Sequence, residues 1–395
     1  MEFIAFHLMP YGVPAAIEAI GSQQPANAWV TFSNRHYDPV AGAELYRRYL
    51  DELAFAAAAG FDGVSVNEHH QNAYGTMPNP NIMASALTQR IPTGRIAVLG
   101  NAIPLHDPLE IIEQVAILDV LSNGRIISGF VRGIGFEYTT FGRNPNESRA
   151  RFAEAHDLIV KAWTDPGPFS WHGEYYHYDY VNPWPRPVQQ PHPPIWVPSQ
   201  GSAETVDWAA ERRYTYLQTF TKLSRVAQIT AEFRAATRAH GYEASPAQIG
   251  WAVPVYAGET DQQARAEYKP HIENFFNRLL AGHLHVWFPP GYTSAASYQR
   301  VVGSRTDLFA HNDHRMEDLE EQGLIIVGSP DTVTRKLREG IDATGAGIVL
   351  PVIQAATLPH ALTMGSIRRL GEEVIPALRD HVSALYSPGP PAPVS

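Results

Sequence analysis

Three consecutive residues, Glu68, His69 and His70, place a carboxylate and two imidazoles one residue after the apolar run 61–66. An imidazole titrates near neutral pH, so such a group could transfer protons or coordinate a metal ion. Adjacent residues at the end of a strand point in different directions. One imidazole can therefore face a pocket while the other supports the structure, and a joint grip on one metal ion is disfavoured. The alternative is a loop whose histidines form only ordinary hydrogen bonds.

A second group of polar residues lies in the motif "VPSQGSAETVDWAA", where a predicted strand runs into a predicted helix of residues 202–212. Free backbone N–H groups and hydroxyls at a helix start form a cradle for a phosphate group. Arg132, in "FVRG", and Arg149, in "NESRARF", could add charge-assisted hydrogen bonds to the same phosphate. The alternative is an ordinary capped helix with surface arginines. The cradle residues are Ser199, Gly201, Ser202 and Thr205.

Other histidines have weaker patterns. His283 and His285 would share one face of an extended segment, and "HNDHRMED" from His311 onward resembles a loose metal cluster. Both lie in an irregular interval away from the predicted strand ends, and those ends carry few carboxylates. We therefore predict no metal site, which disfavours a metal-dependent hydrolase.

The elements that position these residues alternate between short Val- and Ile-rich runs and longer amphipathic ones. Eight predicted strands, most followed by a helix, indicate a parallel sheet buried on both sides. The economical closure is a (β/α)8 TIM barrel, in which polar groups collect at the carboxyl ends of the strands. An open doubly wound sheet would need a Gly-rich turn after its first strand, and "HLMPYGVPAA" lacks one. Further residues at these ends are His7, Tyr11, Asn101 and Phe220.

Two long segments exceed a minimal barrel, residues 165–194 and about 281–325. Loops of this length without helices are uncommon and often cover a site. We predict one domain over residues 1–385, with these two insertions, and a disordered Pro-rich tail over 386–395.

Composition excludes several classes of protein. The net charge is −10 and no basic run is present, which disfavours binding to nucleic acid. The chain has no cysteine, so disulfides, zinc-thiolate sites and thiol nucleophiles are excluded. The N-terminus does not read as a signal peptide, and no apolar run approaches the roughly 20 residues of a membrane helix. We expect a cytoplasmic protein without a membrane partner.

Several motifs together resemble the bacterial luciferase-like flavin-dependent monooxygenases over roughly residues 1–380. They include "NEHH" after the second strand, "LDVLSNGRIISGFVRG", "NESRARFAEAHDLIVKAW" and "PPIWVPSQGSAETVDWAAE". The "EHH" and the run "LDVLSNGRIISGFVRG" are specific in combination. The resemblance implies a (β/α)8 barrel that receives reduced FMN (FMNH2) from a separate NAD(P)H:flavin reductase. It also implies a C4a-(hydro)peroxyflavin that oxygenates a small organic substrate with O2, in a homodimer.

The same resemblance assigns roles to particular residues. His69 matches the catalytic histidine, and Asn101 falls beside the isoalloxazine by its strand position. The FMN-phosphate contacts are Arg132, Arg149, Ser202 and Thr205, with backbone help near Ser199 and Gly201. The substrate-pocket candidates are His7, Tyr11, His70 and Phe220. Val131 replaces the reactive-site cysteine of the luciferase α subunit, which disfavours light emission.

Two alternatives retain the fold: an F420-dependent oxidoreductase and a non-catalytic flavin-binding protein. The "EHH" motif favours FMN over F420, and the histidine with both arginines disfavours a dead site. Hydroxylation, Baeyer–Villiger insertion and oxidative cleavage stay open, because the shape of the pocket is not encoded in any local motif.

Overall fold

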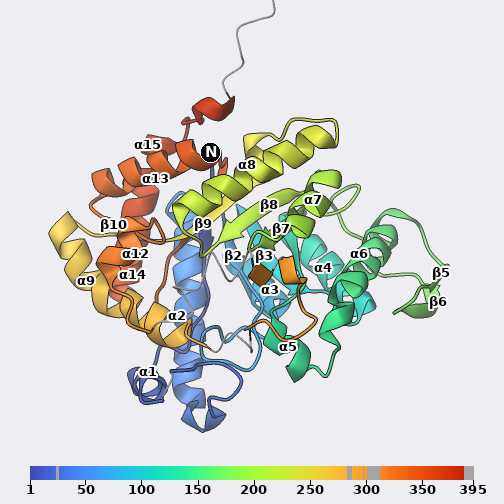
Figure 1. The fold of residues 1–395 in the computed structure, drawn as a ribbon, viewed down its shortest axis with the longest axis horizontal. Helices are drawn as coiled ribbons and strands as arrows, with labels where there is room; N and C mark the ends of the chain where they lie inside the picture. The colour runs from blue at the N-terminus through green and yellow to red at the C-terminus, as the bar shows by residue number, and fades with distance from the viewer. Residues whose placement is uncertain (24–25, 283–286, 297, 300–311, 387–395) are drawn as a thin grey trace, which may run out of the picture.

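The computed structural model describes residues 1–23, 26–282, 287–296, 298–299 and 312–386. In these residues, eight parallel strands close into a barrel in the order β1-β2-β3-β4-β7-β8-β9-β11, and β11 pairs again with β1 (Figure 1). The barrel strands are β1 (Glu2–Phe6), β2 (Gly63–Val66), β3 (Arg95–Ala102), β4 (Ile126–Val131), β7 (Ile195–Ser199), β8 (Thr215–Thr219), β9 (Ile249–Ala257) and β11 (Ile348–Val352). The prediction of a (β/α)8 barrel is confirmed.

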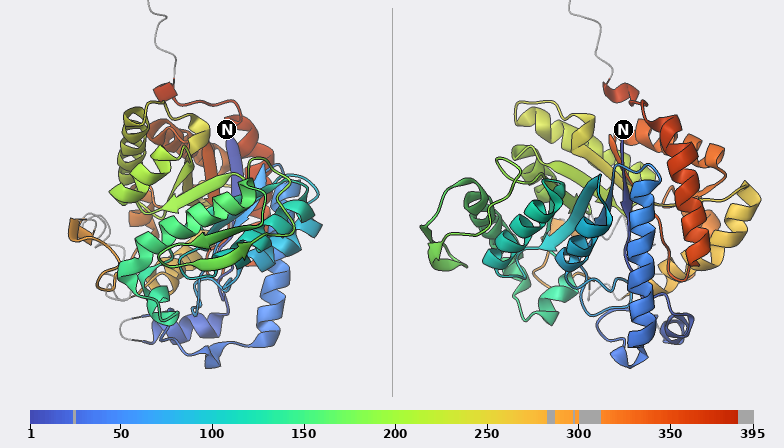
Figure 2. Two further views of the ribbon diagram at one scale, coloured as in Figure 1. Left: turned by 90° about the vertical axis from the view of Figure 1, so that its right-hand side faces the viewer. Right: turned by 180° about the vertical axis from the view of Figure 1, so that it is seen from behind.

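Helices surround the barrel, as two further views show (Figure 2). Four of them begin with a side chain that caps the helix and a proline that follows it, at Asp38, Asn79, Asp107 and Ser329. Proline suits the first helical position, because the N–H that it lacks would have no partner there. The helices are α1 (Pro14–Gly21), α2 (Pro39–Ala58), α3 (Pro80–Arg90), α4 (Pro108–Ser122), α5 (Gly135–Thr140), α6 (Ser148–Thr164), α7 (Ala203–Glu211), α8 (Leu223–Ala239), α9 (Asp261–Asn274), α12 (Met316–Glu321), α13 (Pro330–Thr344), α14 (His360–Arg369) and α15 (Ile375–Leu378).

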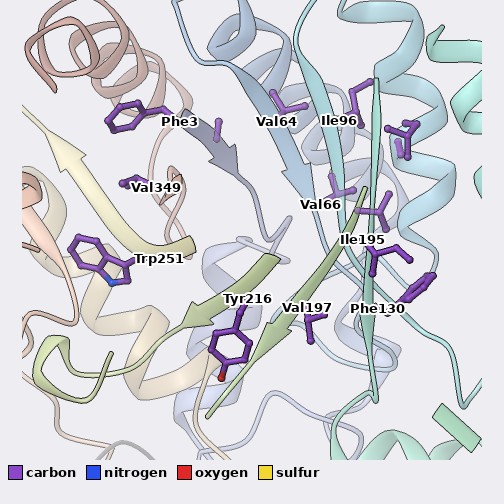
Figure 3. Close-up of a cluster of buried hydrophobic side chains, with 14 of the residues drawn as sticks. Phe3, Val64, Val66, Ile96, Phe130, Ile195, Val197, Tyr216, Trp251 and Val349 are labelled. Atoms are coloured by element: carbon purple, nitrogen blue, oxygen red, sulfur yellow. The ribbon is translucent and has the colours of Figure 1, made fainter. Parts of the chain in front are cut away.

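The alternation of side chains along each strand separates two hydrophobic cores. Val197 packs with the helices in one cluster, whereas its neighbour Trp196 belongs to a second cluster. The first cluster, drawn in Figure 3, includes Phe3, Val64, Val66, Ile96, Phe130, Ile195, Tyr216, Trp251 and Val349. The second fills the barrel and continues into residues above the strand ends, including Trp29, Phe275 and Trp287. The barrel interior is therefore continuous with the segments that cover its carboxyl end.

The segments predicted to be irregular contain regular elements, and the second of them, about 281–325, includes the helix α12. The segment 165–194 contains an antiparallel hairpin of β5 (Phe169–His172) and β6 (His177–Val181), and a short strand, β10 (Ile326–Gly328), pairs with β9. The Glu154 carboxylate of α6 accepts the backbone N–H groups of residues 174, 175 and 176, which fixes the turn of the hairpin. This contact joins separate segments, so no local pattern reveals it. No helix in the described ranges combines the length and apolarity needed to cross a membrane.

Candidate active site

A cavity of about 410 Å³ opens at the carboxyl ends of the barrel strands. Its floor and sides include Leu99 of β3, Val131 of β4 and Ser199 of β7. Segments that follow the strands supply the polar groups, and aromatic residues from distant parts of the chain cover them. Six of the residues predicted for the site line this cavity: His69, Arg132, Arg149, Ser199, Ser202 and Thr205. The substrate-pocket candidate Phe220 lines it as well.

Two guanidinium groups lie at one end of the cavity. Arg132 follows β4, and its Nη1 donates to Ser148 Oγ and to the Tyr292 carbonyl, both at 3.1 Å. Arg149 lies on α6, and its Nη2 is 3.3 Å from Glu204 Oε2. Among the described residues, this buried nitrogen has no hydrogen-bond acceptor of suitable geometry. Burial lowers the pKa of Arg149, and the nearby charge of Arg132 lowers it further. Two positive charges close together in a partly buried site repel each other, so an anion bound between Arg132 and Arg149 would stabilise both.

The start of α7 adds hydroxyl and backbone donors to the same end. Ser202 is the N-cap, and its Oγ lies 3.3 Å from the Thr205 N–H and 2.7 Å from Thr205 Oγ1. Ser199 Oγ accepts the N–H of Gly201, whose φ of +89° is a conformation that glycine adopts readily. Gly201 itself does not line the cavity, so its contribution is to the turn. Two guanidinium groups, two hydroxyls and a helix start form the donor set that a phosphate monoester requires.

His69 lines the cavity just beyond β2. Its ring meets Trp29 edge-on at 5.8 Å and Tyr74 at 5.1 Å between ring centroids. Its Nδ1 is 3.6 Å from Oε1 of Glu137, a carboxylate that is almost fully buried. Glu137 was absent from our sequence prediction. A carboxylate five residues after Arg132 was the only local signal, and the contact with His69 depends on how α5 packs.

The neighbours of His69 face elsewhere and form a separate network. Glu68 Oε1 accepts hydrogen bonds from Nε2 of His70 at 2.8 Å and of His106 at 2.7 Å, and Oε2 accepts the Ala102 N–H. Burial acts to raise the pKa of Glu68, but the two imidazoles dominate and lower it to about 2. These three side chains have the composition of a metal site, yet their spacing is that of direct hydrogen bonds. His70 does not line the cavity.

Three other predicted residues also lie outside the cavity lining. His7 is fully buried, with Nε2 at 2.9 Å from Glu52 Oε2 and Nδ1 accepting the Met9 N–H. The Tyr11 hydroxyl accepts the Asp38 N–H, and Asn101 pairs with the Asn81 side chain. This placement corrects the assignment of His7 and Tyr11 to the substrate pocket and of Asn101 to the flavin side of β3, because many side chains near a strand end point away from the cavity.

The remaining histidine motifs do not join the site. His283, His285 and His311 lie outside the described residues. His314 is described, and its backbone pairs with the Asn277 side chain, beyond the end of α9. The tail over 387–395 also lies outside the described residues.

Comparison with known proteins adds the family. The profile described as luciferase-like monooxygenase matches residues 27–347. The alkanal monooxygenase alpha chain of Aliivibrio fischeri is 24% identical over 81% of this chain and 90% of its own length. The oxygenase component of the flavin-dependent trigonelline monooxygenase of Acinetobacter baylyi is 28% identical over 39% of this chain and 43% of its own length. The uncharacterized protein y4wF of Sinorhizobium fredii is 34% identical over 43% of this chain and half of its own length.

Solved structures share the barrel. The oxygenating constituent of 3,6-diketocamphane monooxygenase from Pseudomonas putida, a type II Baeyer–Villiger enzyme in complex with FMN, gives a TM-score of 0.72 at 21% identity, covering 95% of this chain and 98% of that chain. An F420-dependent secondary alcohol dehydrogenase gives 0.64 at 15% identity, covering 85% and 96%. These structures establish a common fold. Because the family profile spans most of the sequence, the chain belongs to the luciferase-like monooxygenases, as its motifs had indicated.

Proposed function

We propose that the protein is the oxygenase of a two-component system that uses reduced FMN and O2 to oxygenate a small organic substrate. One observation carries the proposal: His69 and the cluster of Arg132, Arg149 and the start of α7 line the same cavity. A phosphate site and an imidazole that can carry a proton, both lining one cavity, are what a flavin-dependent oxygenase requires.

The proposed roles of the chain follow from this geometry. Arg132, Arg149, Ser202 and Thr205 would hold the phosphate of FMN. When bound in its reduced form, FMN supplies the electrons for the activation of O2. His69 moves a proton to or from a bound molecule, because its half-buried ring lines the cavity.

Aromatic residues cover part of the cavity. Trp29 is 1% exposed, and its ring lies 4.6 Å from that of Trp287 and 4.9 Å from that of Tyr74. These residues are far apart in the sequence, and all three line the cavity. Exclusion of water prevents wasteful side reactions of a reactive oxygen species. An oxygenase needs a site that limits the access of water, so this aromatic cover supports the proposal.

The reductase is proposed as a separate protein, and the name of the trigonelline relative, an "oxygenase component", supports this proposal. The homodimer and the cytoplasmic location stay predictions. An F420-dependent oxidoreductase and a non-catalytic flavin-binding protein stay alternatives, because the barrel occurs with F420 as well. Titration with reduced FMN and with F420 distinguishes the first alternative, and oxygen-dependent product formation distinguishes the second.

The binding test uses Arg149→Ala with reduced FMN and reduced riboflavin, both under anaerobic conditions. Charge-assisted hydrogen bonds contribute about 1.5–3 kcal/mol, so the dissociation constant for reduced FMN should rise about 10- to 100-fold. Riboflavin has no phosphate, so its affinity should stay within about twofold. Arg335→Ala, on the exposed face of α13, is the matched control and should change neither value. Unchanged binding of FMN, or an equal loss for riboflavin, contradicts the proposed phosphate site.

A further inference from the structure

The carboxylate of Glu137 is fixed in the wall of the cavity. Glu137 is 1% exposed, and its Oε2 accepts the Ile134 N–H at 2.7 Å where α5 begins. Gly133 precedes this turn with φ of +79°, and a Cβ at that position would lie 2.9 Å from Glu137 Oε2. The backbone therefore packs directly against one oxygen of the carboxylate. The other oxygen, Oε1, faces the imidazole of His69.

The imidazole of His69 presents its buried nitrogen to that oxygen. Nδ1 and Glu137 Oε1 are 3.6 Å apart, and neither has a hydrogen-bond partner within the described part of the chain. Trp29 and Tyr74 flank the ring edge-on, which restricts where it can turn. The separation exceeds a hydrogen bond by a few tenths of an ångström, and contacts of this kind tighten when a ligand fills a site. Two buried polar atoms that face each other in this way make a natural donor and acceptor pair.

We propose that Glu137 is a positioning residue for His69. Its Oε1 accepts the proton on Nδ1, which fixes the tautomer and leaves Nε2 as the unprotonated nitrogen for the cavity. The arrangement of a carboxylate that orients an imidazole through Nδ1 is used in other enzymes to set which nitrogen exchanges a proton. This inference rests on the proposed function, since the exchanged proton is the one that His69 moves there.

The isosteric variant Glu137→Gln tests the tautomer directly. An amide nitrogen cannot accept a hydrogen bond, so the Gln oxygen must take the Ile134 N–H and the –NH2 group must face Nδ1. Nδ1 then becomes the acceptor, and the proton moves to Nε2. Ring ¹⁵N chemical shifts of His-labelled protein report this difference at a pH about two units above the ordinary imidazole value of about 6.5. His69→Gln assigns the signals among the 17 histidines.

The expected result is a protonated Nδ1 in the wild type and a protonated Nε2 in Glu137→Gln. A wild-type His69 with its proton on Nε2 overturns the proposal, and so does the same tautomer in both proteins. The wild-type spectrum is decisive even if the variant fails to fold. The measurement needs no flavin, so it is independent of the proposed function, whose failure would appear as absent flavin binding.

Turnover gives a second readout. Glu137→Gln should lower kcat for oxygenated product by about 100-fold or more, since positioned acid–base groups contribute about 10²–10⁴-fold. KM for the substrate and the affinity for reduced FMN should stay within about twofold. Glu113→Gln, an exposed carboxylate on α4, is the control and should match the wild type. A loss of FMN affinity as large as the loss of kcat would instead assign Glu137 a structural role.

Discussion

Two buried carboxylates flank the histidine motif, and each acts on different neighbours. Glu137 faces His69 at the cavity, whereas Glu68 binds His70 and His106. Of the two consecutive histidines, His69 therefore lines the cavity and His70 belongs to a supporting hydrogen-bond network. Strand alternation allowed this division, but the sequence analysis also made His70 a substrate-pocket candidate, and its position outside the cavity lining corrects that assignment. Glu137 could not be predicted, because it lies 68 residues from His69 in sequence and reaches it only through the packing of α5.

The Glu68 network should make stability depend on pH. Glu68 has a pKa lowered to about 2, from an ordinary 4.5, so its contribution is present above pH 4.5 and lost as the pH falls toward 2. Burial acts to lower the pKa of His106, but Glu68 raises it above 6.5, so its contribution is present below 6.5 and lost at higher pH. The ion pair is therefore strongest between those two ordinary values.

His106→Gln tests this dependence. The loss of unfolding free energy relative to the wild type should be on the order of 1 kcal/mol near the middle of that window. This loss of unfolding free energy should be smaller about two pH units above 6.5, where His106 of the wild type loses its charge. Urea unfolding at both pH values measures the difference. An equal loss at both would show that His106 stabilises the fold through packing and not through its charge.

At the scale of elements, the strands and the β7–α7 turn were predictable because their signals are local. Runs rich in Val and Ile mark the strands, and Ser202 with Thr205 marks the helix start. The hairpin β5–β6 was missed, since its short strands lie in a segment rich in Pro, Tyr and Trp. Its turn depends on Glu154, which belongs to the preceding helix α6. A hairpin that is held by a residue of another element need not show the alternation of apolar and polar residues by which a strand is recognised in the sequence.

The hairpin provides an element-scale prediction. In Glu154→Gln only one oxygen remains to accept three backbone N–H groups and the Trp171 indole N–H. The amides of residues 174–176 should therefore exchange with solvent about tenfold faster or more, as expected for a local opening eased by about 1.4 kcal/mol. Exchange mass spectrometry measures this, with the adjacent Glu174→Gln as the control. Unchanged exchange at these amides would contradict the anchoring role.

At the scale of the molecule, the core between strands and helices stabilises the barrel, and the carboxyl ends of the strands form the cavity. Side chains facing outward from the strands pack with the helices in the first cluster (Figure 3). The inward-facing side chains belong to the second cluster, which includes the aromatic cover. The N-terminus lies beside the segment that follows α15, where the Met1 amino group donates to the Arg379 carbonyl (Figure 1). Closure of the barrel brings His69, Arg132, Arg149 and the start of α7 to one cavity, although they lie on four separate segments.

A crystal structure of the protein with bound FMN tests the central claim most directly. We expect the phosphate between the Arg149 guanidinium and the hydroxyls of Ser202 and Thr205, and the isoalloxazine ring against His69 under Trp29. FMN bound outside this cavity, or with its phosphate away from both arginines, would contradict the proposed oxygenase site.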